Sequence, residues 1–587
     1  MKKIFGLIVL FLLVDINAGN LCCSYPCQNN GVCLTKGFKD YECDCTRTDF
    51  YGKNCDTPNL LKRLKLWLKP KPSTIHNLMI DYQWYWDIVN SLPFLRNFLM
   101  KTFVLIRSNL IDIPPPYDND HSYITLGAHF NHSFYTRVLP PVPEECPTPM
   151  GVAGKKELPD VNALVKKLFV RKKFKPDPIG TSVLFSFMAQ HFSHMFLKTD
   201  FKRGPQYQWG GHGIDVTNIY GKNKHDENLL RSFKDGKLKL QTINSEDWPV
   251  LTKDASVEMH YLGPVPAERE FALGHSFYGN FPGLFMLSTI WMREHNRVCD
   301  VMKKVHPEWD DERIFQTGKL ILLGQTIKIV IEEYVQHLSN YNFKLMFKPD
   351  LLFGENFQYQ ARASVEFNHL YYWHPLMPDE FIIGETNYTM RDILVNPGLV
   401  IKHGMATFVD SLSKQSAGAF TVNNHGAITL PVVQKLIQNG RTLRLQSYNN
   451  YRKRFNLQPY KSFEDLTGNK KLAKVLEDLY GDIDTVEFYV GLIAEKRRPR
   501  GMFSEGLLEI GAPMSIKGVM SNPICSPKYW KPSTFGGDVG FEIVNTATLK
   551  KLFCQNMKGD CPEVSFKVPG FVEQKRTDDD CAEHEEL

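Results

Sequence analysis

The sequence predicts a mainly α-helical protein in which a small disulfide-rich module precedes one large domain. Of its 587 residues, 43% are apolar and 23% are charged, which is typical of a globular chain. Helical hydrophobic periodicity dominates from residue 107 onward, and strand-like runs are short. Seven of the 13 cysteines lie within residues 22–55. We expect five segments, which are a signal peptide (1–18), a cysteine-rich module (20–56), a set of short amphipathic helices (59–106), the large domain (107–572) and an acidic tail (573–587).

The N-terminus predicts entry into the secretory pathway. Lys2 and Lys3 precede an apolar run from Ile4 to Val14, and small residues follow at Ala18 and Gly19. This run is too short to span a bilayer and has the layout of a cleaved signal peptide. Secretion also explains the many cysteines, because disulfides persist in oxidising compartments.

Charge and hydropathy exclude two other classes of protein. A net charge of +6 on so long a chain is a weak bias and argues against nucleic-acid binding. The longest uncharged stretch after the signal peptide, Gly274 to Met292, contains His275, Asn280 and Pro282. We therefore expect a buried core helix there, preceded by a turn, instead of a membrane span.

Residues 20–56 resemble an epidermal-growth-factor-like (EGF-like) module. The resemblance is carried by the spacing Cys27-x5-Cys33-x9-Cys43-x-Cys45-x9-Cys55 and by the pair Tyr51-Gly52. So few apolar residues cannot fold without covalent links. The resemblance implies the bonds Cys22–Cys33, Cys27–Cys43 and Cys45–Cys55, with Cys146 as a candidate partner for Cys23. Such a module is more often structural than catalytic.

Residues 59–106 predict several short amphipathic helices. Leu60, Leu64 and Trp67 follow helical spacing with basic residues between them, Pro70 ends this helix, and Pro93 can open a later one. Helices rich in Trp, Tyr and Leu with basic neighbours suit the interface of one membrane leaflet. Ordinary amphipathic helices packed on a core are the alternative.

The large domain contains no internal repeat. Helical patterns are expected at 160–171, 181–199, 284–304, 311–338, 431–439 and 472–480. Asn131 and Asn387 begin glycosylation sequons and are expected on surface loops. We expect Cys554 to bond with Cys561, and Cys299 and Cys525 to be free and buried.

Two motifs carry candidate chemistry. In Ala189-Gln-His-Phe-Ser-His194, Gln190 and His194 are four residues apart and share one face of a helix. A histidine beside an amide suits acid–base work on a peroxide O–O bond, although a pair of core histidines is the alternative. In Tyr371-Tyr-Trp-His374-Pro, His374 can ligate iron. If this segment is helical, Tyr371 and His374 point the same way, with Trp373 packed between them.

These motifs resemble those of the prostaglandin-endoperoxide synthases, or cyclooxygenases. The run Arg293-Glu-His-Asn-Arg297 resembles one found across the animal haem peroxidase superfamily, and the resemblance covers essentially the whole mature chain. It implies a large helical haem-peroxidase domain that holds one haem b per subunit. His374 would be the proximal iron ligand, His194 the distal histidine assisted by Gln190, and Trp373 a neighbour of the haem.

The resemblance also implies a fatty-acid channel. Arg107, at the end of the last amphipathic helix, would hold the substrate carboxylate, with Tyr341 facing it at the channel mouth. Ser515 matches the serine that aspirin acetylates in the family and is not a nucleophile in the normal reaction. The channel would be lined by Val335, Ser339, Phe192, Phe196, Phe367, Leu370, Phe503, Leu508, Gly511 and Ser515. Leu508 and Arg498 favour different isoforms, so inhibitor selectivity does not carry over.

The implied function is a bifunctional cyclooxygenase and peroxidase. A Tyr371 radical would start addition of two O2 to an arachidonate-like polyunsaturated fatty acid, giving a prostaglandin G2-type hydroperoxide that is then reduced to prostaglandin H2. One alternative is a fatty-acid dioxygenase that releases a linear hydroperoxide. A second is a non-catalytic adhesion protein that uses residues 20–56 and needs no haem.

The resemblance further implies a homodimer bound to one leaflet of the endoplasmic reticulum membrane on its luminal face, with the nuclear envelope as a further location. The last four residues, His584 to Leu587, resemble a variant of the KDEL-type retention signal.

Overall fold

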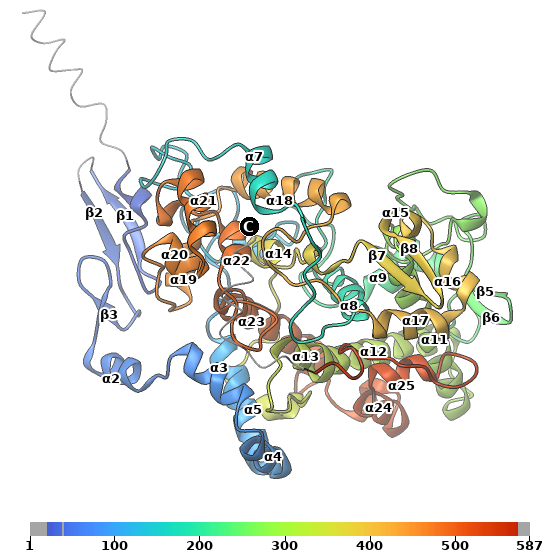
Figure 1. The fold of residues 1–587 in the computed structure, drawn as a ribbon. Coiled ribbons are helices and arrows are strands. Elements are labelled where there is room, and N and C mark those ends of the chain that lie inside the picture. Colours follow the sequence, from blue (N-terminus) through green and yellow to red (C-terminus); the bar gives the residue numbers. More distant parts are fainter. Residues whose placement is uncertain (1–19, 38–39, 573–587) are drawn as a thin grey trace, which may run out of the picture.

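The computed structural model describes residues 20–37 and 40–572 and confirms a mainly α-helical architecture. The expected signal peptide, the acidic tail, its retention-like end and Cys581 lie outside the described residues. Figure 1 shows the cysteine-rich module on one flank of a large helical body, with the short amphipathic helices beneath it.

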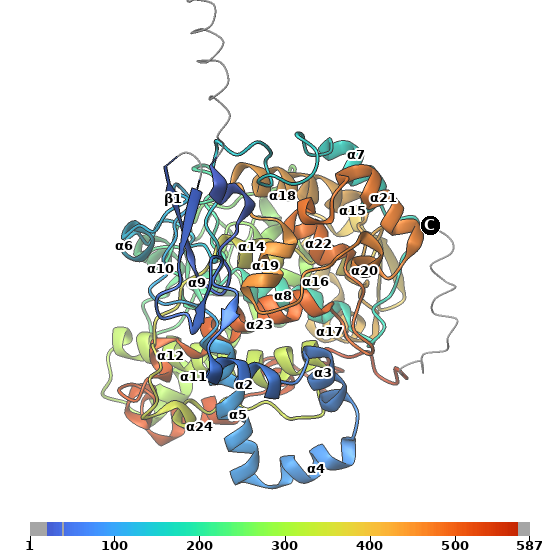
Figure 2. The ribbon, with the colours of Figure 1, turned by 90° about the vertical axis from the view of Figure 1, so that its left-hand side faces the viewer.

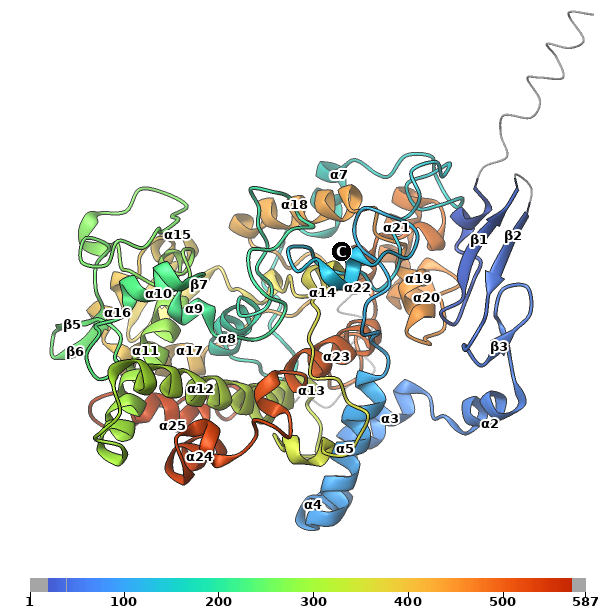
Figure 3. The same cartoon turned by 180° about the vertical axis from the view of Figure 1, so that it is seen from behind.

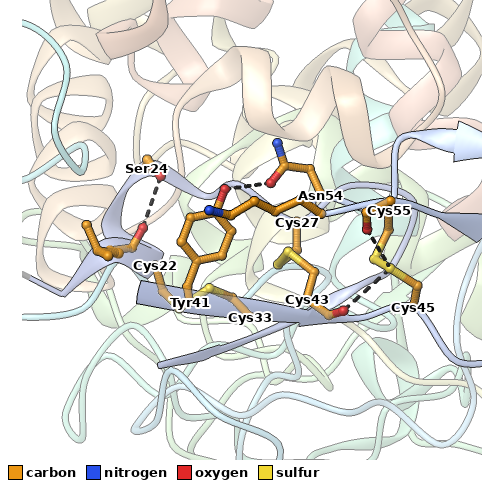
Figure 4. The surroundings of a disulfide bond; sticks show 12 residues. Cys22, Ser24, Cys27, Cys33, Tyr41, Cys43, Cys45, Asn54 and Cys55 are labelled. Atoms are coloured by element: carbon orange, nitrogen blue, oxygen red, sulfur yellow. Dashed lines mark hydrogen bonds between the residues drawn. A yellow bond between two sulfur atoms is a disulfide. The ribbon is translucent and has the colours of Figure 1, made fainter. Parts of the chain in front are cut away.

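The cysteine-rich module is built from two hairpins (Figure 1). Its strands are β1 (Val32–Lys36), β2 (Asp40–Asp44), β3 (Phe50–Tyr51) and β4 (Thr57–Pro58), which follow the 3₁₀ helix Leu21–Ser24. The expected bonds Cys22–Cys33, Cys27–Cys43 and Cys45–Cys55 are formed. Figure 4 shows the Tyr41 hydroxyl donating to Asn54 between these bonds, at 2.6 Å. Cys23 bonds to Cys146 and ties the module to the large domain.

Four helices form the segment below the module (Figure 2). They are α2 (Leu60–Leu68), α3 (Pro72–Ile80), α4 (Gln83–Ser91) and α5 (Pro93–Ser108). Pro72 and Pro93 stand in the first turns of α3 and α5, where their missing N–H groups cost nothing. Many large apolar side chains on these helices are exposed, among them Leu60, Leu61, Trp67, Trp84, Phe94, Phe98 and Ile106.

The core of the large domain is built on three helices. They are α8 (Val183–Ser193), α11 (Pro282–Val305) and α12 (Asp311–Ile329), and α11 and α12 run side by side in Figure 3. The helix α11 is buried along most of its length, as predicted for this uncharged stretch. The segment Asp311–Ser339 is the one described helix that is long and apolar enough to cross a membrane, but 78% of its apolar window is buried in the fold.

The predicted helix at 311–338 is not one regular helix. After α12 the chain forms a π-helix over Val330–Val335 and then α13 (Gln336–Ser339). A π-helix inserts an extra residue per turn and so rotates the side chains that follow it. Tyr334 and Val335 lie in this irregular turn.

The other expected helices exist with shifted ends. The prediction at 181–199 was too long, because α8 ends at Ser193 and tight turns follow from His194 to Leu197. The remaining α-helices are α6 (Gly127–Phe130), α7 (Val161–Leu168), α9 (Thr217–Tyr220), α10 (Lys224–Leu230), α14 (Val365–Leu370), α15 (Met390–Ile393), α16 (Gly398–His403), α17 (Met405–Lys414), α18 (Leu430–Thr442), α19 (Tyr448–Arg454), α20 (Phe463–Thr467), α21 (Lys470–Tyr480), α22 (Phe488–Ala494), α23 (Glu505–Met520), α24 (Asp538–Asn545) and α25 (Leu549–Cys554).

Strands and 3₁₀ helices make up the rest of the regular structure. Two further hairpins pair β5 (Leu240–Ile243) with β6 (Glu246–Pro249) and β7 (Glu380–Ile383) with β8 (Thr386–Thr389). The 3₁₀ helices of the large domain span Ala267–Arg269, Tyr278–Asn280, Pro349–Leu352, His374–Leu376, Ala427–Thr429, Ile483–Thr485, Pro523–Cys525 and Pro532–Phe535.

The remaining cysteines follow expectation, whereas one of the two sequons lies in a hairpin strand and not on the loop that was expected. Cys554 at the end of α25 pairs with Cys561, while Cys299 and Cys525 are free and buried. Asn131, which follows α6, and Asn387, in β8, are both exposed.

Candidate functional site

The helix α8 brings Gln190 and His194 to one face. Ser182 caps its N-terminus by accepting a hydrogen bond from the Phe185 N–H at 3.3 Å, and His194 stands at its C-cap. The His194 N–H reaches the Gln190 carbonyl oxygen at 3.2 Å, so the two residues are one helical turn apart. Both side chains keep part of their surface free although the rest of α8 is almost wholly buried. The expected amide–histidine pair therefore lies on one face of the helix and is less buried than most of α8.

The segment that carries His374 is not helical, which corrects one prediction. The helix α14 ends at Leu370, Tyr371 is its C-cap, and a 3₁₀ helix begins at His374. Trp373 does not stand between Tyr371 and His374 on a common helix face. Its ring stacks on Tyr371 with centroids 4.5 Å apart, and its Nε1–H donates to the Leu370 carbonyl at 2.7 Å. The helix α14 has therefore ended before Pro375, which stands in the first turn of the separate 3₁₀ helix, where its missing N–H costs nothing.

Two expected haem-site histidines, His194 and His374, are neutral and unpaired. Burial lowers the pKa of each to about 4, and for His194 repulsion from a protonated His374 contributes to that lowering. Among the described residues, no protein group hydrogen-bonds either side chain. Nearby, both ring nitrogens of buried His425 also lack a partner. Neutral imidazole is the form that ligates iron, so these donors fit a haem group bound between the helices.

Arg171 braces the segment on the His374 side. Its guanidinium is almost buried and donates to the carbonyl oxygens of Pro375 at 3.1 Å and Met377 at 2.8 Å. The same group donates to the Asn424 carbonyl at 2.6 Å and pairs with Asp379 at 2.8 Å. Arg171 thereby holds the backbone that follows His374 against the backbone at Asn424. No signal in the sequence singled out Arg171.

Tyr371 lies in a cage of aromatic rings. Its ring is 5.0 Å from Phe367 and 5.7 Å from Phe196, both edge-on, and Phe192 is 4.9 Å from Phe196. Burial raises the pKa of the Tyr371 phenol to about 12, and the nearby polar side chains of Tyr334 and Ser515 act in the opposite direction. The phenol thus keeps its hydrogen at physiological pH.

The helix α23 supplies the opposite wall. Leu508, Gly511 and Ser515 are spaced three and four residues apart and so share a face. A Cβ placed on Gly511 would lie 3.0 Å from a Leu370 methyl group, so any larger residue here would have to displace the Leu370 side chain slightly. Trp373 packs on Phe503 with ring centroids 4.6 Å apart. Of the other expected channel residues, Ser339, Phe192, Phe196, Phe367, Leu370 and Phe503 are buried, while Val335 is half-buried.

The expected carboxylate site already contains a carboxylate of the protein. Arg107, in the last turn of α5, forms a two-pronged ion pair with Glu509 of α23, and one of its bonds measures 3.1 Å. Arg498 also pairs with Glu509, at 2.7 Å, and its Nη1 lies 3.5 Å from the Tyr341 hydroxyl. Burial by itself would raise the pKa of Glu509, but Arg107 and Arg498 lower it to about 2. Arg107 and Tyr341 are therefore linked indirectly, because Glu509 and Arg498 lie between them. We call Arg107, Glu509 and Arg498 the charged cluster.

Sequence reasoning missed Glu509 and Tyr334. Glu509 had a detectable signal, since it is a lone carboxylate on the otherwise apolar middle stretch of α23. Tyr334 had none, because its position beside Tyr371 depends on the π-helix. The described residues hold no cluster of three or more His, Cys, Asp or Glu side chains suited to a metal ion, so iron would depend on His374 and a haem.

The match to a family model gives the class of this protein, the haem peroxidases. The animal haem peroxidase family matches residues 202–564. Two solved structures share the fold at 17% identity: peroxidase A from Dictyostelium discoideum, with a TM-score of 0.61 over 77% of this chain and 98% of that one, and fatty acid alpha-dioxygenase from Arabidopsis thaliana, with 0.60 over 88% and 98%.

Two curated relatives narrow this class. Prostaglandin G/H synthase 2 of Oryctolagus cuniculus is 55% identical over 558 residues, which are 94% of this chain and 92% of the relative. Prostaglandin G/H synthase 1 of Rattus norvegicus is 52% identical over 554 residues, with the same coverage. The chain therefore belongs to the prostaglandin G/H synthases within the animal haem peroxidase family.

Proposed function

We propose that this enzyme converts an arachidonate-like polyunsaturated fatty acid and two O2 into a prostaglandin G2-type hydroperoxide and reduces it to prostaglandin H2. The observation that carries this proposal is identity of 52–55% to both types of prostaglandin G/H synthase over 94% of the chain. The packing of Tyr371 against Trp373, one residue before His374, agrees with it.

In the peroxidase half, the distal residues move one proton. Haem bound by His374, which we take to be haem b, supplies the electrons for cleaving the peroxide bond and the oxidising power that removes an electron from a nearby tyrosine. Neutral His194 accepts the hydroperoxide proton and returns it to the departing oxygen, which leaves as the alcohol. The Gln190 amide, one turn away on the same face, donates a hydrogen bond to the peroxide.

In the cyclooxygenase half, Tyr371 is the oxidant of the fatty acid. Loss of an electron and of its phenolic proton leaves a neutral radical, which takes a hydrogen atom from a doubly allylic carbon. Two O2 then add, and the last peroxyl radical takes a hydrogen atom back from Tyr371. The side chains of Tyr334 and Ser515 lie close enough to Tyr371 to affect the pKa of its phenol. An acetyl group on Ser515, as aspirin would add, would obstruct this space.

The charged cluster holds the other end of the substrate. The substrate carboxylate takes over a guanidinium face of Arg107, and Glu509 keeps its second partner, Arg498. Tyr341 adds a hydroxyl group from across the mouth. This exchange of partners keeps every buried charge paired. The apolar wall from Leu508 to Gly511 and Ser515 then directs the chain toward Tyr371.

The exposed apolar helices indicate that the fatty acid enters the protein from the membrane. We infer that α2 to α5 lie in one leaflet of the endoplasmic reticulum membrane on its luminal side, including the continuous nuclear envelope. Arg107 closes α5, so the channel mouth opens where these helices meet the catalytic domain. Glycans at Asn131 and Asn387 fit this luminal location.

A second exposed apolar patch supports a homodimer. Tyr123, Ile124, Leu126 and Phe130 are between 52% and 76% exposed on one short stretch of chain. Patches of this kind mark protein–protein contacts. We propose a homodimer that covers this patch, which light scattering in detergent would test.

The decisive experiment measures oxygen uptake with arachidonate by detergent-solubilised, haem-reconstituted protein, followed by product identification. The wild type should form a prostaglandin endoperoxide. Tyr371→Phe should lose at least ~100-fold of the uptake and keep peroxidase activity, since the hydrogen acceptor alone is removed. A linear hydroperoxide as the sole product would favour the dioxygenase alternative, for which 17% identity offers a likeness of fold alone. The adhesion alternative does not agree with membership of an enzyme family.

A further inference from the structure

A second imidazole lies directly against the proposed distal histidine. His275 precedes the 3₁₀ helix Tyr278–Asn280 that leads into α11. Its ring centroid is 4.5 Å from that of His194, with an angle of 72° between the planes. The distal side of this protein therefore offers His275 as well as Gln190 and His194.

His275 rests on a rigid platform. Its ring stacks on Tyr278 with centroids 4.7 Å apart and planes 23° apart. Tyr278 is fully buried, its hydroxyl donates to the His191 carbonyl at 3.1 Å, and it accepts from the Asn218 amide at 3.2 Å. Because its support is anchored to α8, the position of His275 relative to His194 is fixed.

The backbone also fixes which ring nitrogen of His275 carries the proton. The Phe277 N–H points at Nδ1 of His275 over 3.2 Å, and a backbone N–H can only donate. Burial, His194 and His191 keep the pKa of His275 well below its usual value, so the ring is neutral. Its one proton is then on Nε2. Among the described residues no group accepts a hydrogen bond from this Nε2–H, and the ring remains partly accessible.

We propose that His275 is a second distal catalytic residue, whose Nε2–H donates a hydrogen bond to the hydroperoxide oxygen that departs as the alcohol. The inference rests on the proposed peroxidase function and on His194 as its proton carrier. The hydroperoxide gives its proton to His194, and the O–O bond breaks. The outer oxygen leaves with the bonding electron pair and receives that proton, while the haem supplies the two electrons. His275 keeps its own proton and stabilises the negative charge that develops on the departing oxygen.

Two variants of similar length separate hydrogen bonding from packing. His275→Gln keeps an N–H donor, and His275→Met does not. Three quantities are measured on haem-loaded protein: peroxidase kcat/KM with a fatty-acid hydroperoxide, the fraction of that hydroperoxide converted to alcohol, and the dissociation constant of cyanide from the shift of the Soret band. Bound cyanide accepts a hydrogen bond from a distal donor, so its affinity reports the donor independently of turnover.

The Met variant should lose ~100-fold of kcat/KM, the loss typical of one donor to a developing oxyanion. Its alcohol fraction should fall and its cyanide affinity should weaken, whereas the Gln variant should stay within about threefold of the wild type on this scale. His225→Met, at an exposed position of α10, is the matched control. Equal behaviour of Met and Gln variants with normal haem spectra would overturn the proposal. Failure of the proposed function looks different, since wild type itself would then lack peroxidase activity or His194→Ala would retain it.

Discussion

The two ends of the proposed active site differ in charge: the histidine end is neutral, and the Arg107 end is charged. The rings of His194 and His374 are neutral and have no hydrogen-bond partner among the described residues. Around Arg107 the buried groups are charged and already paired, because Glu509 bridges Arg107 and Arg498. Burial disfavours the charged form of any group, so an isolated imidazole becomes neutral. Two guanidinium groups overcome this effect at Glu509 and keep its carboxylate ionised.

This difference indicates how each end receives its ligand. Unpaired neutral imidazoles can take up a metal centre or a single proton without breaking an interaction. A paired charge cluster can accept a fatty-acid carboxylate only by exchanging partners, which gives selectivity for an anionic head group. The rings that contact Tyr371 are Phe196, Phe367 and Trp373, and none of them is charged.

The largest expected effect is the loss of haem binding when His374, at the neutral end of the site, is replaced. His374→Ala should weaken haem binding by more than ~100-fold and abolish both activities, since even outer partners of metal ligands contribute 10–100-fold. Titration of the Soret band measures the affinity. Added imidazole should restore the band by filling the space left by the side chain, and His225→Ala should behave as wild type. A normal band in His374→Ala would remove this residue from the iron.

Removal of the Arg107 charge should weaken binding of the fatty acid and leave the peroxidase reaction unchanged. Arg107→Gln removes a charge-assisted pair of hydrogen bonds worth about 2 kcal/mol, so KM for arachidonate should rise roughly 10–100-fold. Steady-state oxygen uptake measures KM, and peroxidase activity with a small hydroperoxide should be unchanged. Arg63→Gln, an exposed cation on α2, controls for a general loss of basic charge near the membrane. An equal loss of both activities would contradict the separation of the two ends.

The Arg171 brace makes the comparison sharper. Arg171→Ala releases the carbonyl oxygens of Pro375 and Met377 without touching an imidazole. We expect haem affinity to fall by ~10-fold, as for other residues that orient a ligand, with KM for the fatty acid unchanged. Partial recovery in Arg171→Lys would support the brace. If KM changes and haem affinity does not, the two ends are coupled through the backbone.

The smallest effect concerns stability in acid. The pKa of Glu509 is lowered to about 2 in the folded protein and returns to its ordinary range on unfolding. A depressed carboxyl pKa stabilises the fold above the unfolded pKa, and this contribution is lost as the pH falls from about 5 toward 2. Glu509→Gln should therefore show a shallower loss of unfolding free energy in this window, by on the order of 2 kcal/mol. Denaturant titrations at several pH values would measure it, and parallel curves would contradict the pairing.

Particular residues show where sequence reasoning succeeded and where it failed. The placement of Gln190 and His194 on one helix turn is confirmed, while the catalytic roles of their side chains stay a prediction. The helical arrangement considered for Tyr371 and His374 is not formed, because α14 ends at its C-cap Tyr371 and a separate 3₁₀ helix begins at His374. Stacking of Tyr371 on Trp373, 4.5 Å apart, replaces the common helix face.

The sequence alone determined the mainly helical class of fold, and its resemblance to an EGF-like module implied the disulfide framework that the structure confirms, while the roles of the site residues stay predictions. These features are local, since they depend on spacing within a helix, on cysteine intervals or on short motifs. Tertiary structure decided that Glu509 pairs with both Arg107 and Arg498, that Tyr334 in the π-helix lies near Tyr371, and that His275 lies against His194. Each of these contacts joins residues brought together by packing between different segments, and no local pattern encodes that distance.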